Sequence, residues 1–294
     1  MTCRNPRARL LDALILLALT VAAALVFYRI RDGLHYRWEW EAIPQYLFRR
    51  DPEHGTWLPN VLMHGFFTTI RLSIWATLLA CLIGSAMGLM RLSARRFRRW
   101  VGCAYVELIR NTPPLVLVFL FYYFIGEQLL PTVGLEELIR RQPPETQSLL
   151  SALLAPPGGI TAFVSAVVTV ALFEGAYITE IVRAGVRSIE KVQREAAAAL
   201  GLTRWQRMRH VVLPQAIRRI LPPLGSQFIS TIKDSAIVSV ISIQELTFRG
   251  MELMSATYLT FETWITITAL YFVLTFGCSL VFARMERAGR RGMA

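Results

Sequence analysis

Long apolar blocks alternate with short polar segments along the whole chain. Each block has 19 to 25 residues, and the blocks lie at about 10–28, 66–90, 105–126, 160–182, 224–248 and 260–283. A helix of this length crosses a hydrocarbon core of ~30 Å, because it rises about 1.5 Å per residue. The pattern therefore predicts an all-α membrane protein with six transmembrane helices.

The distribution of basic residues supports six crossings. The segments 1–9, 91–100, 183–223 and 284–294 together hold 21 Lys and Arg residues, whereas the alternate segments 29–65, 127–159 and 249–259 hold eight. Basic segments stay on the cytoplasmic side of a membrane, so both termini are expected in the cytoplasm. Lys233, Asp234 and Glu245 interrupt the fifth block. That block must still cross, because otherwise the Arg-rich tail would lie outside.

The first block is predicted to be a retained span. Arg4, Arg7 and Arg9 precede the apolar run Leu10–Tyr28, as basic residues precede the core of a signal peptide. The run is longer than the usual signal-peptide core, and aromatic and basic residues follow it in place of a small-residue cleavage site.

Two segments are expected outside the membrane. Segment 29–65 carries Trp38, Trp40 and Trp57, which suit a membrane–water boundary. Segment 127–159 contains two proline pairs around Leu149–Leu154, which predicts an external loop with one short surface helix.

Overall composition excludes several classes of protein. Hydrophobic residues make up 54% of the chain and charged residues 18%, too apolar for an ordinary soluble domain. The net charge of +12 does not indicate nucleic-acid binding, because the basic residues follow the membrane topology. The four cysteines show no CxxC or Cys/His spacing, so neither a metal site nor a disulfide framework is expected. The chain also lacks GxxxxGK[ST], HExxH and GxSxG motifs, so we expect no enzyme activity.

The cytoplasmic loop 183–223 carries strong helix signals. Ser188 is predicted to cap a helix over Ile189–Leu200, and Gly201 to end it. Thr203 and Gln206 have the spacing of a capping box for a second helix, which runs to about Val212 and is expected to end at Pro214.

The first of these helices has an apolar stripe, formed by Ile189, Val192, Ala196, Ala199 and Leu200. Such a pair of capped helices fits a docking element for another protein. It equally fits interfacial helices that lie on anionic lipid, and the residues alone do not separate these alternatives.

A spaced motif runs through the loop: Glu195-Ala196-Ala197, then Gly201, then Val211, and then Leu213-Pro214. This pattern resembles the EAA motif of ABC-importer permeases, with Val211 in place of the usual isoleucine. The elements keep fixed spacing over 20 residues, which makes the match specific.

Further segments resemble the polar amino-acid subfamily of these permeases, namely Leu108–Leu115, Ala176–Gly185, Lys233–Ser235 and Glu245-Leu246. The similarity covers about residues 60–285. Departures are Val192, the Ser235-Ala236-Ile237 stretch, Glu174 and the long segment 127–159, and they leave the substrate open.

The resemblance implies a five-helix type I importer core with one additional N-terminal helix. It divides the chain into an N-terminal helix with its external segment (1–59), a permease domain (60–285) and a basic cytoplasmic tail (286–294). It implies that the EAA residues couple to a separate cytoplasmic ATPase, which would hold ATP and Mg while this chain holds no cofactor. It also implies a second permease (self or related), an external solute-binding protein, surrounding lipid, and a bacterial inner-membrane location.

Charges within spans are costly and usually face a partner or a cavity. Candidate pathway residues are Glu174, Tyr177, Glu180, Lys233, Asp234 and Glu245. Glu180 is expected to pair with Arg183 one turn on. Lys233 and Asp234 are hypothesised to meet the charges of a zwitterion, although an interhelical pair that only fixes packing is equally possible.

Proline interrupts the third block. Thr112-Pro113-Pro114 predicts a break near the start of that span. The alternative function is an ion-coupled secondary transporter, but it would not need a capped cytoplasmic loop and would more often show an inverted repeat.

Overall fold

The computed structural model describes residues 6–33 and 36–291. The chain divides into two compact units, Met1–Trp40 and Glu41–Ala294. The first contains α1 (Pro6–Gly33), which includes the first predicted block. Its leucines from Leu14 to Leu25 are exposed, as a lipid-facing helix requires. Arg4 and the last three residues of the basic tail lie outside the described residues.

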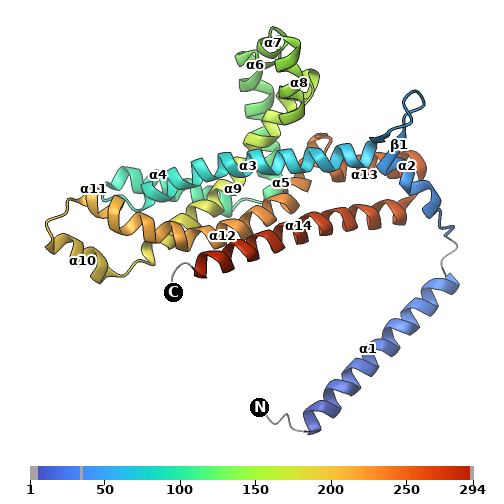
Figure 1. Cartoon of the computed structure of the whole chain (residues 1–294), viewed down its shortest axis with the longest axis horizontal. Coiled ribbons are helices and arrows are strands. Elements are labelled where there is room, and N and C mark those ends of the chain that lie inside the picture. The colour runs from blue at the N-terminus through green and yellow to red at the C-terminus, as the bar shows by residue number, and fades with distance from the viewer. Residues whose placement is uncertain (1–5, 34–35, 292–294) are drawn as a thin grey trace. The chain divides into compact units, whose positions relative to one another are not determined.

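The second unit is almost entirely helical. Its long helices are α3 (Val61–Arg91), α9 (Ile160–Arg187), α12 (Leu213–Asp234) and α14 (Thr260–Arg291). Figure 1 shows α3, α12 and α14 running side by side. The shorter helices are α2 (Ile43–Leu47), α4 (Arg96–Arg110), α5 (Pro114–Phe121), α6 (Leu130–Val133), α7 (Leu135–Arg140), α8 (Pro144–Leu153), α10 (Lys191–Ala199), α11 (Arg204–Arg207) and α13 (Leu246–Thr257).

Four stretches of the described residues are long and apolar enough to cross a membrane, namely Val61–Arg91, Pro114–Thr132, Ile160–Arg187 and Thr260–Arg287. The second of these joins α5 to α6 through the π-helical turns Tyr122–Leu129. These stretches overlap four of the predicted blocks, and the third block is shifted from 105–126 to 114–132, so the chain is a mostly helical, multi-pass membrane protein.

A small hairpin corrects the prediction of a purely α-helical protein. Strands β1 (Phe48–Arg50) and β2 (Trp57–Pro59) pair antiparallel, with Phe48 opposite Pro59. The turn between them contains Gly55 with φ +66°. Aromatic residues at the strand ends and this turn residue favour a hairpin, but three-residue strands leave little periodicity in the sequence.

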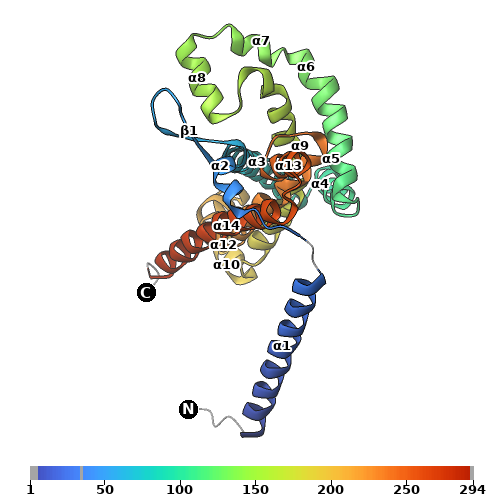
Figure 2. The same ribbon diagram turned by 90° about the vertical axis from the view of Figure 1, so that its right-hand side faces the viewer.

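The segment 127–159 is more helical than predicted. The single short helix expected there is present as α8, but α6 and α7 precede it. These three helices lie together, away from α12 and α14, in both views (Figures 1 and 2).

The predicted break in the third block is confirmed. Helix α4 ends at Arg110 and α5 begins at Pro114. Thr112 and Pro113 lie between the two helices, because a residue before proline is disfavoured in helical conformation.

The fifth block is not one helix, which corrects the predicted span over 224–248. Helix α12 ends at Asp234, a 3₁₀ stretch follows over Ser235–Ile241, and Ser242 is left-handed with φ +60°. The helix instead begins earlier, at Leu213, and its 22 residues reach about 33 Å at 1.5 Å per residue. Helix α12 is therefore long enough to cross, but it is not one of the four stretches of the described residues that are also apolar enough.

Helices α3 and α9 form the centre of the unit. Small residues recur every fourth position along α3, at Ala76, Ala80, Gly84 and Gly88, and all are buried. Such a stripe lets two backbones approach closely, which is how helices associate in lipid. The apolar core around it includes Ile178 and Val182 of α9.

Candidate functional site

Helices α10 and α11 are joined by a well-defined turn. Gly201 is left-handed, with φ +75°. Its N–H donates to Ala198 O (3.0 Å), and the N–H of Leu202 donates to Ala197 O (3.2 Å). This is the Schellman arrangement, and it satisfies carbonyls that would otherwise be unpaired at the helix end. The predicted stop at Gly201 is confirmed.

The predicted capping box is also confirmed. The Gln206 N–H donates to Thr203 Oγ1, and the Thr203 N–H donates to Gln206 Oε1 at 2.9 Å. Both ends of the α10–α11 turn are therefore fixed by hydrogen bonds, so the turn holds a defined angle between the two helices.

Two details of the predicted helices are wrong. Ser188 does not cap α10, because α9 continues to Arg187 and the Ser188 hydroxyl donates to Gly185 O (2.7 Å); Glu190 occupies the N-cap position. Pro214 does not end the second helix. A π-helical turn over Met208–Val212 leads straight into α12, and Pro214 lies in its first turn, where its missing N–H costs little.

The predicted apolar stripe of α10 is mostly on the surface. Val192 and Leu200 are 67% and 81% exposed, whereas Ile189, just before the helix, is buried. Ala197 is the buried residue of α10. The helix thus exposes apolar side chains, and it packs on the rest of the unit through Ala197.

The other motif residues lie around this contact. Glu195 is exposed and pairs with Lys191 at 3.2 Å, while Ala196 is exposed. Val211 is half-buried in the π-helical turn, and Leu213 and Pro214 are exposed at the start of α12. The structure therefore gathers the motif residues on one end of the unit.

Two arginines anchor the base of α10. Arg194 Nη2 donates to Val186 O (2.6 Å), and Arg219 of α12 donates to Ser188 O. Beneath them, Val186, Ile189, Val212, Ala216 and Ile220 belong to one apolar core, which continues to Ile178 and Ala80 in the centre of the unit. A force on α10 would therefore reach α3, α9 and α12 through packed side chains.

Glu180 forms the predicted ion pair. Its Oε2 lies 2.6 Å from Arg183 Nη2, and Arg91 at the end of α3 pairs with Oε1. Arg91 was not among the predicted partners; the basic end of the second block was its signal in the sequence. These contacts link α9 to α3.

Glu174 is fully buried. Gln227 Nε2 of α12 donates to Glu174 Oε2 at 2.6 Å, and the Asp234 carboxyl lies near Glu174. Asp234 and its neighbour Lys233 are exposed at the end of α12. About two turns of α12 separate Gln227, which contacts this interior carboxylate of α9, from the two exposed charges at the helix end.

Tyr177 lies one turn from Glu174 and is half-buried. It packs edge-on against Phe173, and the Arg110 guanidinium lies over its ring at 5.8 Å. Tyr177 therefore connects α9 to the break between α4 and α5.

Glu245 caps α13. Its carboxylate accepts from the N–H groups of Thr247 (2.9 Å) and Phe248 (2.8 Å) and from Tyr271 Oη (2.9 Å). Thr69 Oγ1 lies 3.4 Å away. These contacts account for a fully buried carboxylate as a structural element that joins α3, α13 and α14.

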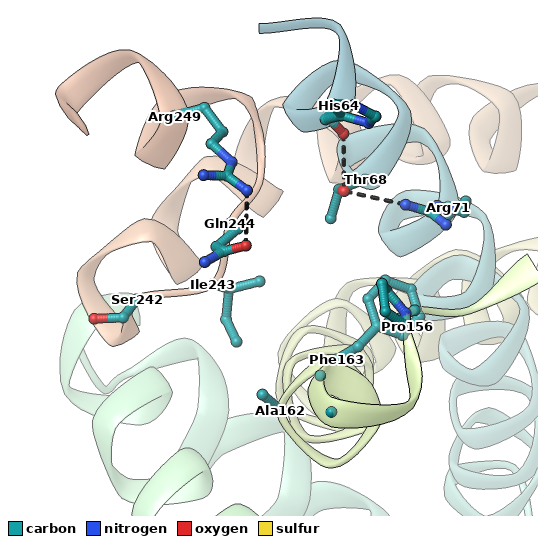
Figure 3. A pocket seen from close by; sticks show the side chains of 13 residues that line it. His64, Thr68, Arg71, Pro156, Ala162, Phe163, Ser242, Ile243, Gln244 and Arg249 are labelled. Carbon is teal, nitrogen blue, oxygen red and sulfur yellow. Dashed lines mark hydrogen bonds between the residues drawn. The ribbon is translucent and has the colours of Figure 1, made fainter. Parts of the chain in front are cut away.

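A cavity of about 660 Å³ lies between α3, the start of α9 and the segment that leads into α13. It is lined by His64, Thr68, Arg71, Ala155, Pro156, Gly158, Gly159, Ala162, Phe163, Ser242, Ile243, Gln244 and Arg249. Figure 3 shows Arg71 and Thr68 of α3 on one side and Gln244 and Arg249 on the other. No pathway residue predicted from the sequence lines it. Arg71, a charge within an apolar block, was the available signal.

The two arginines of this cavity differ in their partners. Arg249 pairs with Glu252 (2.7 Å) and donates to Gln244 Oε1 (2.8 Å). Arg71 Nη1 donates to the carbonyls of Ser151 and Ala152 (3.0 and 3.3 Å). Within the described residues no carboxylate forms an ion pair with Arg71.

Residues 80–291 match the family of binding-protein-dependent transport system inner membrane components. The chain belongs to this family. It is 35% identical over 221 residues to the glutamine transport system permease protein GlnP of Escherichia coli K12, covering 74% of this chain and 89% of the relative. It is 33% identical over 253 residues to the glutamate/aspartate import permease protein GltJ of the same organism, covering 86% and 95%.

Solved structures agree. A crystal structure of an amino acid ABC transporter with histidines superposes with a TM-score of 0.62 at 34% identity, covering 78% of this chain and 94% of the other. The MetNI methionine ABC transporter, at 18% identity and a TM-score of 0.58, shares the fold. This chain is thus a membrane permease subunit of an ABC importer and not an ion-coupled secondary transporter, and it does not itself catalyse ATP hydrolysis.

Proposed function

We propose that this permease imports a polar amino acid across a bacterial inner membrane and couples to a separate ATPase through the α10–α11 loop. In this proposal the chain crosses the membrane six times, with both termini in the cytoplasm. Residues 1–59 form the additional helix and external segment, 60–285 the transport domain, with the coupling loop at 183–223, and 286–294 a cytoplasmic tail.

One observation carries the coupling role. Val192 of α10 and Leu200, directly after it, are exposed, although the base of the helix is fixed by Arg194, Arg219 and the core around Ile189. Exposed apolar side chains on a helix that is held firmly in place are typical of a surface that another protein covers. Glu195, Ala196, Ala197, Gly201, Val211, Leu213 and Pro214 belong to this surface or to its support.

The basic segments support the orientation. The α10–α11 loop and the α3–α4 turn are rich in arginine, and such segments remain in the cytoplasm. This orientation brings α10 to the side where ATP is available, while the cavity around Arg71 faces the outside, where a solute-binding protein delivers substrate. The ATPase partner would hold ATP and Mg.

The relatives and the cavity support the substrate class. The relatives are named for glutamine and for glutamate or aspartate. The cavity offers Arg71, Thr68 and Gln244 as hydrogen-bonding groups, which suit the carboxylate and polar atoms of such solutes. Further along, Glu174, Tyr177, Glu180, Lys233 and Asp234 are candidates for the pathway. Among them Glu180 is engaged by two arginines, and Glu245 is occupied as a helix cap, so Glu174, Lys233 and Asp234 are the stronger ones.

A second permease, either another copy or a related chain, would complete the pathway. The surfaces of α5 and α14 are apolar and exposed, for example at Leu120 and Phe276. Lipid or a second permease would cover them.

The experiment is purification of the tagged chain in mild detergent, with identification of its stoichiometric partners by mass spectrometry. Leu200→Asp on α10 is compared with Leu138→Asp on α7; the two leucines are 81% and 54% exposed. We expect a P-loop ATPase with the wild type and with Leu138→Asp, and its loss with Leu200→Asp at unchanged thermal stability. The coupling role is contradicted if Leu200→Asp still recovers the ATPase. It is also contradicted if neither the wild type nor any variant recovers one. A second permease in the sample identifies a heterodimer.

A further inference from the structure

A second cavity lies at the end of the unit that carries α10. Its volume is about 450 Å³, and it is lined by Leu89, Met90, Leu92, Ser93, Arg98, Arg204, Trp205 and Met208. The end of α3, the first turn of α4 and the short helix α11 border this open cavity. Figure 1 shows α4 and α11 close together at this end.

Positive charge surrounds the cavity. Arg98 and Arg204 line it. Further arginines flank these two in the sequence, namely Arg95, Arg96, Arg99, Arg207 and Arg209. Segments 92–106 and 196–212 contain no acidic residue. In the part of the chain that the structure describes, none of these arginines forms an ion pair.

The first turn of α4 adds to this charge. Arg95 occupies the N-cap position and makes no side-chain capping bond. The unpaired amides of a helix start carry a partial positive charge. An anion at this point would therefore meet helix amides as well as guanidinium groups.

Apolar side chains form the other part of the cavity. Leu89 and Trp205 are 46% and 69% exposed, and Met90 and Met208 lie beside them. On the adjoining face of α4, Phe97 and Trp100 are 74% and 68% exposed. A free phosphate ion would use the arginines only. A ligand with a phosphate and acyl chains would use both parts, and aromatic residues are typical of the membrane–water boundary.

We propose that this cavity binds the headgroup of an anionic phospholipid from the cytoplasmic leaflet, with Arg98 and Arg204 on the phosphate and Trp205 against the upper acyl chain. Basic pockets between membrane helices on the cytoplasmic side bind such headgroups. Lipid binding at this site is separate from solute import. The proposal rests on the proposed orientation, which places this end of the unit at the cytoplasmic leaflet. Because it touches α11, the bound lipid would brace the α10–α11 loop from the membrane side.

The test uses the full chain in nanodiscs. Lipid retained by the wild type is measured by native mass spectrometry in mixtures of phosphatidylglycerol and phosphatidylcholine. The Arg98→Gln/Arg204→Gln double variant is compared with Arg284→Gln/Arg287→Gln, which removes the same charge from exposed arginines of α14. We expect preference for phosphatidylglycerol to fall about thirtyfold in the first variant only, since each basic residue at a membrane surface contributes a factor of about five.

A charge-preserving variant and two further measurements separate the alternatives. Arg98→Lys/Arg204→Lys is expected to keep most of the retained lipid, which shows that a loss in the glutamine variant is not misfolding. Added inorganic phosphate at millimolar concentration is expected not to displace the lipid. Equal lipid retention by all variants, or displacement by phosphate, overturns the proposal. So does a glutamine variant that keeps its lipid and loses only the ATPase, because the arginines would then belong to protein docking.

Discussion

A Cβ atom added to Gly84 of α3 would lie 2.6 Å from Cγ2 of Ile178 on α9. The same comparison at Gly88 gives 2.9 Å to Val182 Cγ1. No side chain of an α3 residue separates the two helices at these positions, so isoleucine and valine of α9 rest directly on the backbone of α3. This contact lies at the centre of the second unit, and the apolar core that supports α10 extends to it.

Gly84→Ala is expected to destabilise the protein by about 1–3 kcal/mol, because the added methyl group overpacks a buried contact. Gly277→Ala on α14 is the control, since nothing lies within 4 Å of a Cβ there and alanine is the better helix former. The thermal midpoint in detergent, followed by size-exclusion chromatography, measures both. Equal midpoints for the two variants would show that α9 moves aside without cost.

Glu245→Gln is expected to cost about 1–3 kcal/mol, because a carboxylate that accepts from two backbone amides and Tyr271 loses its charge-assisted bonds. Glu252→Gln serves as the control: Glu252 is half-exposed and pairs only with Arg249 in the ion pairs of the described residues, so about 0–1 kcal/mol is expected. The thermal midpoints of the two variants in detergent measure this difference. A large loss of transport by Glu245→Gln at unchanged stability would instead indicate a pathway role.

The outcome at Glu245 illustrates what the sequence could and could not predict. Hydropathy and the capping pattern predicted four apolar spans, the Gly201 stop and the Thr203–Gln206 box, because each depends on residues a few positions apart. The role of Glu245 depends on Thr69 and Tyr271, which lie on other helices. An intramembrane charge in the sequence does not reveal whether it faces a cavity or a helix end.

The small residues of α3 were a signal that hydropathy concealed. A spacing of four residues separates Ala76, Ala80, Gly84 and Gly88, and this spacing predicts a close helix contact. A hydropathy count does not distinguish these small residues from other apolar residues of the block. The early start of α12 was hidden in another way. A proline often ends a helix, but Pro214 lies in the first turn of α12, directly after a π-helical turn, where its missing N–H costs little.

Glu180 and Arg91 are expected to be energetically coupled. Their side chains are only 21% and 14% exposed, so solvent screens the pair weakly. A double-mutant cycle with Glu180→Gln and Arg91→Met is expected to give a coupling energy of about 0.5–3 kcal/mol. The exposed Lys191–Glu195 pair is the comparison, with about 0.3–0.5 kcal/mol expected for a helical pair at this spacing. Equal couplings for the two pairs would contradict this difference.

Arg71→Met is expected to loosen the segment that contains α8. Arg71 donates to the carbonyls of Ser151 and Ala152 at the end of that helix, and Trp75 Nε1 donates to Leu153 O (3.0 Å). Loss of the guanidinium leaves those carbonyls without this donor. Limited proteolysis in detergent is expected to cut segment 127–159 several times faster, with Arg140→Met on exposed α7 as the control. An unchanged proteolysis rate would show that Arg71 does not hold α8 in place, and solute binding would then be its remaining proposed role.

Gly201→Ala and Gly134→Ala separate coupling from stability. Both glycines are left-handed, with φ +75° and +65°, and nothing lies within 4 Å of a Cβ at either. The cost in each case is therefore the backbone conformation, about 1–2 kcal/mol. Gly134 lies between α6 and α7, whereas Gly201 sets the angle of the proposed coupling helices.

We expect both alanine variants to show the same small loss of thermal stability. Substrate-stimulated ATPase activity in proteoliposomes is expected to fall severalfold only with Gly201→Ala, because the α10–α11 turn opens part of the time and the contact with the ATPase then weakens. Equal ATPase activity in the two variants, at equal stability, would show that the left-handed turn is not required for coupling. The contact would then depend on the exposed side chains of α10 alone.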